Sequence, residues 1–346
     1  MKDLFTIIIP TRNRHQYLTR SLDYYSSIQD IHVIVCDSSP EKYPHEIPAI
    51  IQYVHLPGNT FAQKLALISD LVKTPYVLMC ADDDFMTMEG IEKSVEFLEA
   101  NKDYSSAQGN YIAFYFISGV IHYLPLYTTG VGVDINEDDP KLRISRYFGS
   151  GVQMYYCVHR IENFRQIFKS SAEKILNLNL MEYYIGLSTL IAGKHKVLPV
   201  FYSCRELLYN SSGKSAGINE LSINPKFAKE YGIFFDQISE LLAQIANIGI
   251  VAAGEIIEAE VKKYVDSSRS KEFYKKRKRS GIIQKIIPTS IRRGLSKTLF
   301  SMNKSKNIQK NIDFANTHSG FPFNNEEGKK ELDQIKSFIL KHNIHQ

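Results

Sequence analysis

The stretch Tyr76-Val77-Leu78-Met79-Cys80, followed directly by Ala81-Asp82-Asp83-Asp84-Phe85, decides how the rest of the chain is interpreted. Its first half is the short apolar run of a buried strand, and its second half carries three consecutive carboxylates. Carboxylates this close repel one another, and partial burial adds a desolvation cost. A bound divalent cation would remove that cost, because Mg²⁺ and Mn²⁺ prefer carboxylate oxygen, and a diphosphate could complete its coordination. We therefore expect a metal site at Asp82, Asp83 and Asp84.

Expected strands and helices alternate through the first part of the chain. The strands are predicted at Thr6–Pro10, Ile31–Cys36, Ile50–Leu56 and Tyr76–Cys80, and the helices at Gln16–Ser27, Phe61–Val72 and Thr87–Ala100. This alternation indicates βαβ units around a mostly parallel sheet. Ligands bind beyond the carboxyl ends of such strands. The residues Pro10-Thr11-Arg12-Asn13, Asp37 and the three aspartates should therefore gather at one edge of the sheet.

The later part of the chain changes in character. A β-hairpin is predicted from Tyr111–Ile117 and Val120–Tyr127, strands at Val152–Val158 and Lys196–Ser203, and helices after Pro140 and over Ile161–Phe168, Leu178–Ile191, Phe227–Val265 and Glu326–Leu340. The polar loop Asn210–Asn219 is expected to close over a ligand. We predict an α/β domain over residues 1–220 and a helical C-terminal domain over 221–346.

The composition is typical of a globular protein, with 44% hydrophobic and 23% charged residues. The four cysteines lie far apart in mostly apolar surroundings, which favours reduced core thiols over disulfides or a zinc site. No apolar run reaches the roughly 18 to 20 residues of a membrane span. The N-terminus lacks the long apolar run and the cleavage site of a signal peptide. These observations favour a cytoplasmic protein.

The segment 262–310 is strongly basic, with 16 Lys and Arg residues against the two acids Asp266 and Glu272. It combines this charge with the apolar pairs Ile282-Ile283 and Ile286-Ile287. A cationic, amphipathic segment suits docking on an anionic membrane surface, which would make the protein peripheral on the inner face of the cell membrane. The alternative is a solvated helical face. Nucleic acid is not expected as a partner, because the segment lacks interleaved aromatic side chains for stacking.

The series Ile7-Ile8-Ile9-Pro10-Thr11-Arg12-Asn13-Arg14, Asp37 and Ala81-Asp82-Asp83-Asp84 resembles the start of family 2 glycosyltransferases of the GT-A fold. The resemblance covers about residues 4–206 and implies a GT-A α/β fold with a mostly parallel, Rossmann-like sheet. It also implies that Pro10, Thr11 and Arg12 lie against a nucleotide's base and ribose, and that Asp37 accepts a hydrogen bond from a uracil-type base. The three aspartates would hold Mn²⁺ or Mg²⁺ and the diphosphate.

The register of the three aspartates stays open. An Asp-x-Asp pattern would pair Asp82 with Asp84, whereas the strand length usual in the family places Ala81 at the first aspartate and Asp83 at the metal ligand. We keep all three as metal ligands, with Asp83 and Asp84 ahead of Asp82. The resemblance also places Lys64 where the family often has an arginine that faces the diphosphate, although a surface lysine is an equal alternative. Arg205, at the end of the last predicted strand, is a candidate phosphate contact.

The resemblance implies a general base at Glu182, near the start of a helix that ends at Gly193. The family's usual Glu-Asp pair is reduced here to Glu182-Tyr183. A lone carboxylate among Leu, Met and Tyr residues should have a raised pKa, which suits removal of a proton from a sugar hydroxyl. Such a base would act in an in-line displacement that inverts the anomeric carbon.

We therefore expect a metal-dependent, inverting glycosyltransferase that moves a sugar from a nucleoside-diphosphate sugar donor to a glycan or lipid-linked acceptor. One alternative is a sugar nucleotidyltransferase, although its glycine-rich loop is missing from Pro10–Arg14. Another is a non-catalytic nucleotide-sugar-binding module. Structural alternatives also stay open: Asp84 as a helix N-cap, Asp37 as a loop cap, Glu182 as an ordinary polar residue and Arg14 as a surface charge.

Overall fold

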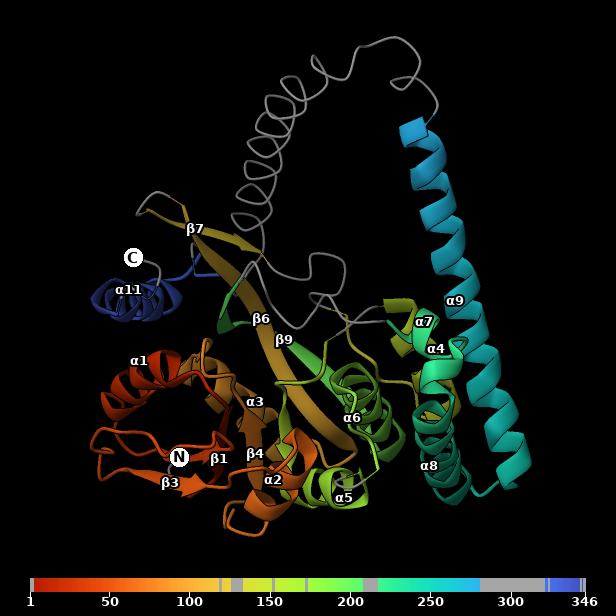
Figure 1. The fold of residues 1–346 in the computed structure, drawn as a ribbon, viewed down its shortest axis with the longest axis horizontal. Helices are drawn as coiled ribbons and strands as arrows, with labels where there is room; N and C mark the ends of the chain where they lie inside the picture. The colour runs from red at the N-terminus through yellow and green to blue at the C-terminus, as the bar shows by residue number, and fades with distance from the viewer. Residues whose placement is uncertain are drawn as a thin grey trace.

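The computed structural model describes residues 3–117, 120–125, 133–150, 153–171, 174–207, 217–280, 321–322, 324–342 and 344. These residues contain a nine-stranded mixed sheet in the order β3-β2-β1-β4-β8-β6-β9-β5, with β7 paired to β6. Helices cover both faces of this sheet (Figure 1). The predicted α/β class is therefore confirmed.

The first half of the sheet is parallel. Its elements are β1 (Phe5–Thr11), α1 (His15–Ser26), β2 (His32–Asp37), β3 (Ile51–His55), α2 (Phe61–Ser69) and β4 (Tyr76–Met79). β1 lies between β2 and β4 and pairs in parallel with both. Ile7 and Ile9 point into one core and Ile8 into the other, as expected for a strand buried on both faces. Because Thr11 pairs with Asp37, the carboxyl ends of β1 and β2 lie side by side.

The second half of the sheet is mixed. Its elements are β5 (Phe85–Met86), α3 (Met88–Ala100), β6 (Tyr104–Ile117), β7 (Val120–Pro125), β8 (Val158–Arg160) and β9 (Lys194–Glu206). The predicted hairpin is confirmed as β6 and β7. The strand predicted at Val152–Val158 is wrong, because only Val158–Arg160 finds partners, in β4 and β6. The apolar residues Met154 and Cys157 lie just before β8, outside any strand, and their side chains are buried in the core. Their apolar character therefore reflects core packing and not strand pairing.

The remaining helices lie on two sides of the sheet. They are α4 (Pro140–Ser150), α5 (Ile161–Ser171), α6 (Leu178–Ala192), α7 (Ile218–Leu221), η2 (Pro225–Phe227), α8 (Ala228–Ala246), α9 (Ile250–Ser280) and α11 (Glu326–Lys341). α8 and α9 pack with α4 and α6, whereas α11 packs against α1 and β9 in the other core (Figure 1). The region after residue 220 is thus helical where it is described, and the domain boundary stays a prediction.

The helix predicted over Phe227–Val265 is interrupted. Asn247, with a left-handed φ of 52°, ends α8, and the chain turns before α9 begins. Within the described residues, no single helix is long and apolar enough to cross a membrane. Pro225–Ala246 and Ile250–Ser267, bent by 118° at the break between them, reach the length and the apolar composition of a membrane span only as a pair. Most of the loop predicted to close, Asn210–Asn219, and the basic segment after residue 280 lie outside the described residues.

The segment that follows the three aspartates is locked to β9. Thr87, just before α3, donates from its backbone N to Tyr202 O at 2.9 Å and from its hydroxyl to Phe201 O at 2.6 Å. One turn later, Gly90 approaches β9 so closely that a Cβ there would lie 2.5 Å from Phe201 O. This close approach fixes the acidic segment against the end of β9, which carries further site residues.

We predict that Gly90→Ala lowers the free energy of unfolding by about 1–3 kcal/mol, because the added methyl group meets backbone atoms that cannot move alone. Urea unfolding followed by circular dichroism measures this change. Gly232→Ala in α8 is the matched control, since a Cβ there meets nothing within 4 Å and alanine favours a helix by about 1 kcal/mol. Equal stability of the two variants would contradict the proposed close packing.

Candidate active site

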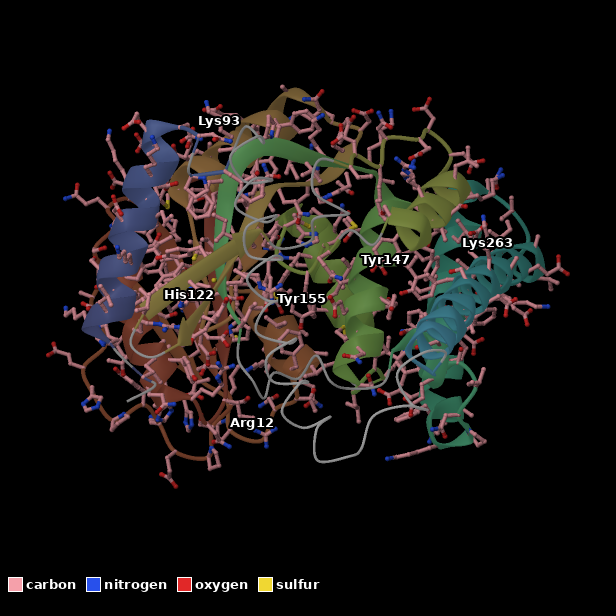
Figure 2. All side chains as sticks on the ribbon, turned by 90° about the horizontal axis from the view of Figure 1, so that it is seen from above. Arg12, Lys93, His122, Tyr147, Tyr155 and Lys263 are labelled. Atoms are coloured by element: carbon pink, nitrogen blue, oxygen red, sulfur yellow. The ribbon has the colours of Figure 1, made fainter. Side chains whose placement is uncertain are left out.

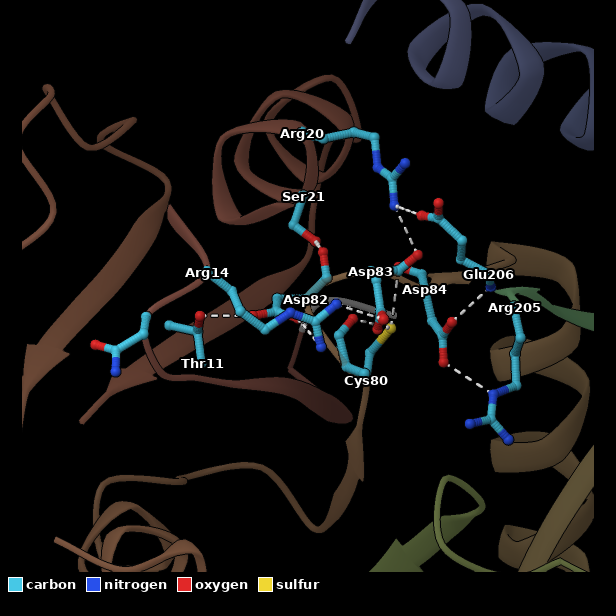
Figure 3. Close-up of polar contacts among 12 residues, drawn as sticks. Thr11, Arg14, Arg20, Ser21, Cys80, Asp82, Asp83, Asp84, Arg205 and Glu206 are labelled. Atoms are coloured by element: carbon cyan, nitrogen blue, oxygen red, sulfur yellow. Dashed lines mark hydrogen bonds and ion pairs between the residues drawn. The ribbon is translucent and has the colours of Figure 1, made fainter. Parts of the chain in front are cut away.

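The three aspartates form a buried cluster at the carboxyl edge of the sheet. Asp82, Asp83 and Asp84 are 2%, 8% and 3% exposed. They follow β4, which ends at Met79, after the two residues Cys80 and Ala81. A solvated turn is therefore excluded. Nor does Asp84 cap a helix, because Thr87 occupies the N-cap position of α3. The cluster is held by side chains from β1, α1 and β9 (Figure 3).

Asp82 and Asp83 share one arginine. Arg14 places Nη1 3.3 Å from Asp82 Oδ1 and donates from Nη2 to Asp83 Oδ2 at 2.5 Å. The hydroxyl of Thr11, the last residue of β1, donates to Asp82 Oδ2 at 2.6 Å. The guanidinium of Arg14 also lies 4.4 Å from the centre of the Tyr17 ring. Arg14 is thus part of the site, and the surface-charge alternative is wrong.

Asp84 is held from the opposite side, by the end of β9. Its Oδ2 accepts a hydrogen bond from Arg205 Nε at 2.8 Å, and its Oδ1 accepts one from the backbone N of Glu206 at 2.9 Å. Burial raises the pKa of both Asp82 and Asp84, while Arg14 acts to lower that of Asp82 and Arg205 that of Asp84. Two guanidinium groups therefore supply much of the compensation that the sequence argument assigned to a cation.

A second arginine-based contact supports the backbone of the cluster. Arg20, which is 1% exposed on α1, donates from Nη2 to Asp83 O at 2.8 Å and to Glu206 Oε2 at 2.5 Å. Ser21 donates from its hydroxyl to Asp82 O at 3.0 Å. Arg20, Ser21 and Glu206 were not predicted from the sequence as site residues. A sequence signal existed for Arg20, because it lies on the apolar face of α1, between Tyr17 and Tyr24.

Asp37, the predicted base contact, is fully buried and saturated with hydrogen bonds. Its Oδ1 accepts from the backbone N and the hydroxyl of Ser39, at 2.8 and 2.5 Å. Its Oδ2 accepts from Tyr53 OH at 2.8 Å and lies 3.0 Å from His15 Nε2. Burial acts to raise the pKa of Asp37, but these hydrogen bonds outweigh it and lower the pKa. Asp37 therefore orders the loop after β2, and contact with a base would require exchange of one of these bonds.

Lys64 and Arg12 occupy opposite environments. Lys64 of α2 is 3% exposed, and its Nζ donates to Thr11 O at 2.8 Å and lies 3.3 Å from Ser38 Oγ. Burial lowers the pKa of Lys64, and the surface-lysine alternative is wrong. Arg12 is exposed at the edge of the molecule (Figure 2). The predicted nucleotide contacts thus include one buried cation that joins the ends of β1 and β2, and one that is open to solvent.

Glu182 lies half-buried in the second turn of α6. Burial raises the pKa of Glu182, and the positive charge of Arg205 opposes this rise. Within the described part of the chain no hydrogen bond or ion pair holds its carboxylate. The structure therefore leaves Glu182 free to accept a proton, and places Arg205 within electrostatic reach of both Glu182 and Asp84.

The fit of a metal ion depends on the oxygens that are still available. No group of three or more His, Cys, Asp or Glu side chains among the described residues is arranged to hold an ion. Both oxygens of Asp84 are engaged, and those of Asp82 face Thr11 and Arg14. Asp83 keeps Oδ1 without a hydrogen bond from any described residue. The residues therefore fit a cation at Asp83, with Asp82 beside it, if Arg14 gives way.

Among solved structures, the chain is similar to S. aureus TarS 1-349, with 13% identity, 82% of this chain and 75% of that chain covered, and a TM-score of 0.48. For the same protein in complex with UDP-GlcNAc the values are 14%, 78%, 75% and 0.49. No curated protein matches the sequence. The model for glycosyl transferase family 2 matches residues 6–175. Residues 6–175 thus match glycosyl transferase family 2, and the chain is a glycosyltransferase with an α/β fold.

Proposed function

We propose that the chain transfers a sugar from a nucleoside-diphosphate sugar to a hydroxyl group of a glycan or lipid-linked acceptor, with inversion at the anomeric carbon. One observation carries this proposal: the three buried aspartates at the carboxyl edge of the sheet are paired with Arg14 and Arg205. Arg205 pairs with Asp84 at 2.8 Å, and its positive charge also opposes the rise that burial causes in the pKa of Glu182. A sugar donor held at the aspartate cluster could face an acceptor held beside Glu182.

The donor would lie along the carboxyl ends of β1 and β2. Pro10, Thr11 and the exposed Arg12 would contact its base and ribose, with Asp37 ordering the loop beside them. The diphosphate would meet Arg14, Arg205 and the buried charge of Lys64. Arginine is well suited to this contact, since its planar fork donates two parallel hydrogen bonds to phosphate oxygens.

The proposal includes a divalent cation, Mn²⁺ or Mg²⁺, held by Asp83 and Asp82, while Asp84 orders the segment through β9. When bound, such a cation neutralises charge that develops on the leaving diphosphate. Glu182 accepts the proton of the acceptor hydroxyl as that oxygen attacks the anomeric carbon and the bond to the diphosphate breaks. A raised pKa suits this role because it makes the carboxylate a stronger base.

The acceptor side is proposed from the basic segment 262–310, which would bring the enzyme to an anionic membrane surface. The first part of this segment, to residue 280, continues α9 away from the core shared with α4 and α6 (Figure 1). A peripheral position on the inner face of the cell membrane would suit a lipid-linked acceptor. Product analysis separates this function from nucleotidyl transfer, which would consume a nucleoside triphosphate and release pyrophosphate.

We predict that nucleotide sugars raise the melting temperature of the protein, and that Mn²⁺ enlarges this shift. Asp83→Asn should weaken donor binding in the presence of Mn²⁺ by about tenfold or more, because a neutral amide holds a divalent cation poorly. Thermal shift over a donor concentration series measures both effects. Asp333→Asn, an exposed residue of α11, is the control for loss of one charge. Unchanged donor binding by Asp83→Asn would remove Asp83 from the site.

We predict that Glu182→Gln lowers kcat by about 10²–10⁴-fold with little change in donor affinity, because it removes only the base. In the wild type, the activity should rise with pH through the raised pKa of Glu182, as the carboxylate loses its proton. This acidic limb should disappear in the residual activity of the variant. Steady-state kinetics across pH test this, with Glu255→Gln on the exposed side of α9 as the control. A variant that keeps both the rate and the limb would exclude Glu182 as the base.

A further inference from the structure

We propose that Arg14 and the divalent cation compete for Asp82 and Asp83, so that Arg14 is a displaceable internal cation of the donor-free enzyme. This inference rests on the proposed metal-assisted function and adds a specific role for one side chain. In the donor-free state, Arg14 holds the two carboxylates together. When a cation binds, the guanidinium leaves them and stays at the mouth of the site.

The competition follows from the oxygens that each group needs. Arg14 engages Asp82 Oδ1 and Asp83 Oδ2, and Thr11 engages Asp82 Oδ2. Of the four oxygens on these two side chains, this leaves only Asp83 Oδ1 without a partner among the described residues. A single carboxylate oxygen is a weak site for a hard cation, which needs several oxygen ligands. A cation shared by both aspartates must therefore take the oxygens that Arg14 now occupies.

Arg14 is also the arginine of the site that can move. Its side chain is 34% exposed, compared with 1% for Arg20, which is fixed between Asp83 O and Glu206. Arg14 is the residue just before α1, and it makes no side-chain capping bond there. The Tyr17 ring, 4.4 Å away, offers a surface along which the guanidinium can stay in contact. Arg205 is less exposed, at 24%, and its guanidinium lies 4.7 Å from the centre of the Tyr156 ring while it pairs with Asp84.

The charge of the cluster favours this exchange only when a donor arrives. Arg14 and Arg205 leave the three carboxylates with one negative charge uncompensated. A divalent cation in place of Arg14 would bring the cluster to neutrality. The released guanidinium would then add a positive charge next to it, which suits a diphosphate and not an empty site. Metal and donor should therefore bind cooperatively, and the metal alone should bind weakly.

The test is a Mn²⁺ titration of the donor-free protein, followed by electron paramagnetic resonance of the free ion. Arg14→Met keeps an unbranched side chain over Tyr17 but removes the competing charge. We expect it to bind Mn²⁺ about tenfold or more tightly than the wild type, with Arg14→Lys in between. Arg146→Met is the matched control, because it removes the same charge from an exposed position on α4, outside the site. It should change the affinity less than about threefold.

Three results would overturn the proposal: Mn²⁺ affinity equal in Arg14→Met and wild type, weaker affinity in Arg14→Met, or no Mn²⁺ binding in any variant. If Arg14→Met fails to fold by circular dichroism, Arg14→Lys decides the question with the same titration. A nucleotide-sugar titration of the wild type separates this inference from the proposed function. Donor binding with an unchanged Mn²⁺ affinity in Arg14→Met would refute only the competition, whereas tighter Mn²⁺ binding without donor binding would refute only the function.

Discussion

The burial of three consecutive carboxylates at the end of β4 is the constraint on which the rest of the site depends. An unpaired buried charge costs several kcal/mol, so each carboxylate needs a partner with good geometry. The chain provides Arg14 for Asp82 and Asp83, and Arg205 with the backbone of Glu206 for Asp84. Because these partners come from the start of α1 and from the end of β9, satisfying the aspartates also fixes those two segments relative to β4.

The supporting contacts divide the site into a rigid part and a movable part. Arg20 and Glu206 form a buried ion pair beneath the aspartates, and removal of either partner would leave a buried charge uncompensated. The buried Lys64 holds the end of β1 through a hydrogen bond to Thr11 O. By contrast, Arg14 and Arg205 reach the aspartates from partly exposed positions, with side chains 34% and 24% exposed. The scaffold is therefore organised before any ligand arrives, and adjustment is confined to the side that the donor would approach.

The sequence predicted the first half of the fold well because each element there has its own local signal. The β-branched run Thr6–Pro10 and the alternation of strands with helices require no knowledge of distant partners. The errors arose where tertiary packing decides. Met154 and Cys157 are apolar because they fill a core, yet only Val158–Arg160 has strands on both sides to pair with. The break between α8 and α9 depends on the left-handed φ of the single residue Asn247. The helical spacing of apolar residues continues across this position and therefore does not predict the break.

The site was predicted only as far as it is local in sequence. The three aspartates stand together in the chain, whereas Arg14 lies 69 residues from Asp83 and Arg20 lies 186 residues from Glu206. No spacing rule connects such pairs. An indirect signal did exist, because Arg20 interrupts the apolar face that Tyr17 and Tyr24 define on α1. A charge within an apolar stripe must find a buried partner, and this chain has an excess of buried acid at one strand end. The arginine within the apolar face of α1 and the excess of buried acid at one strand end therefore explain each other, and together they would have placed α1 against the acidic cluster.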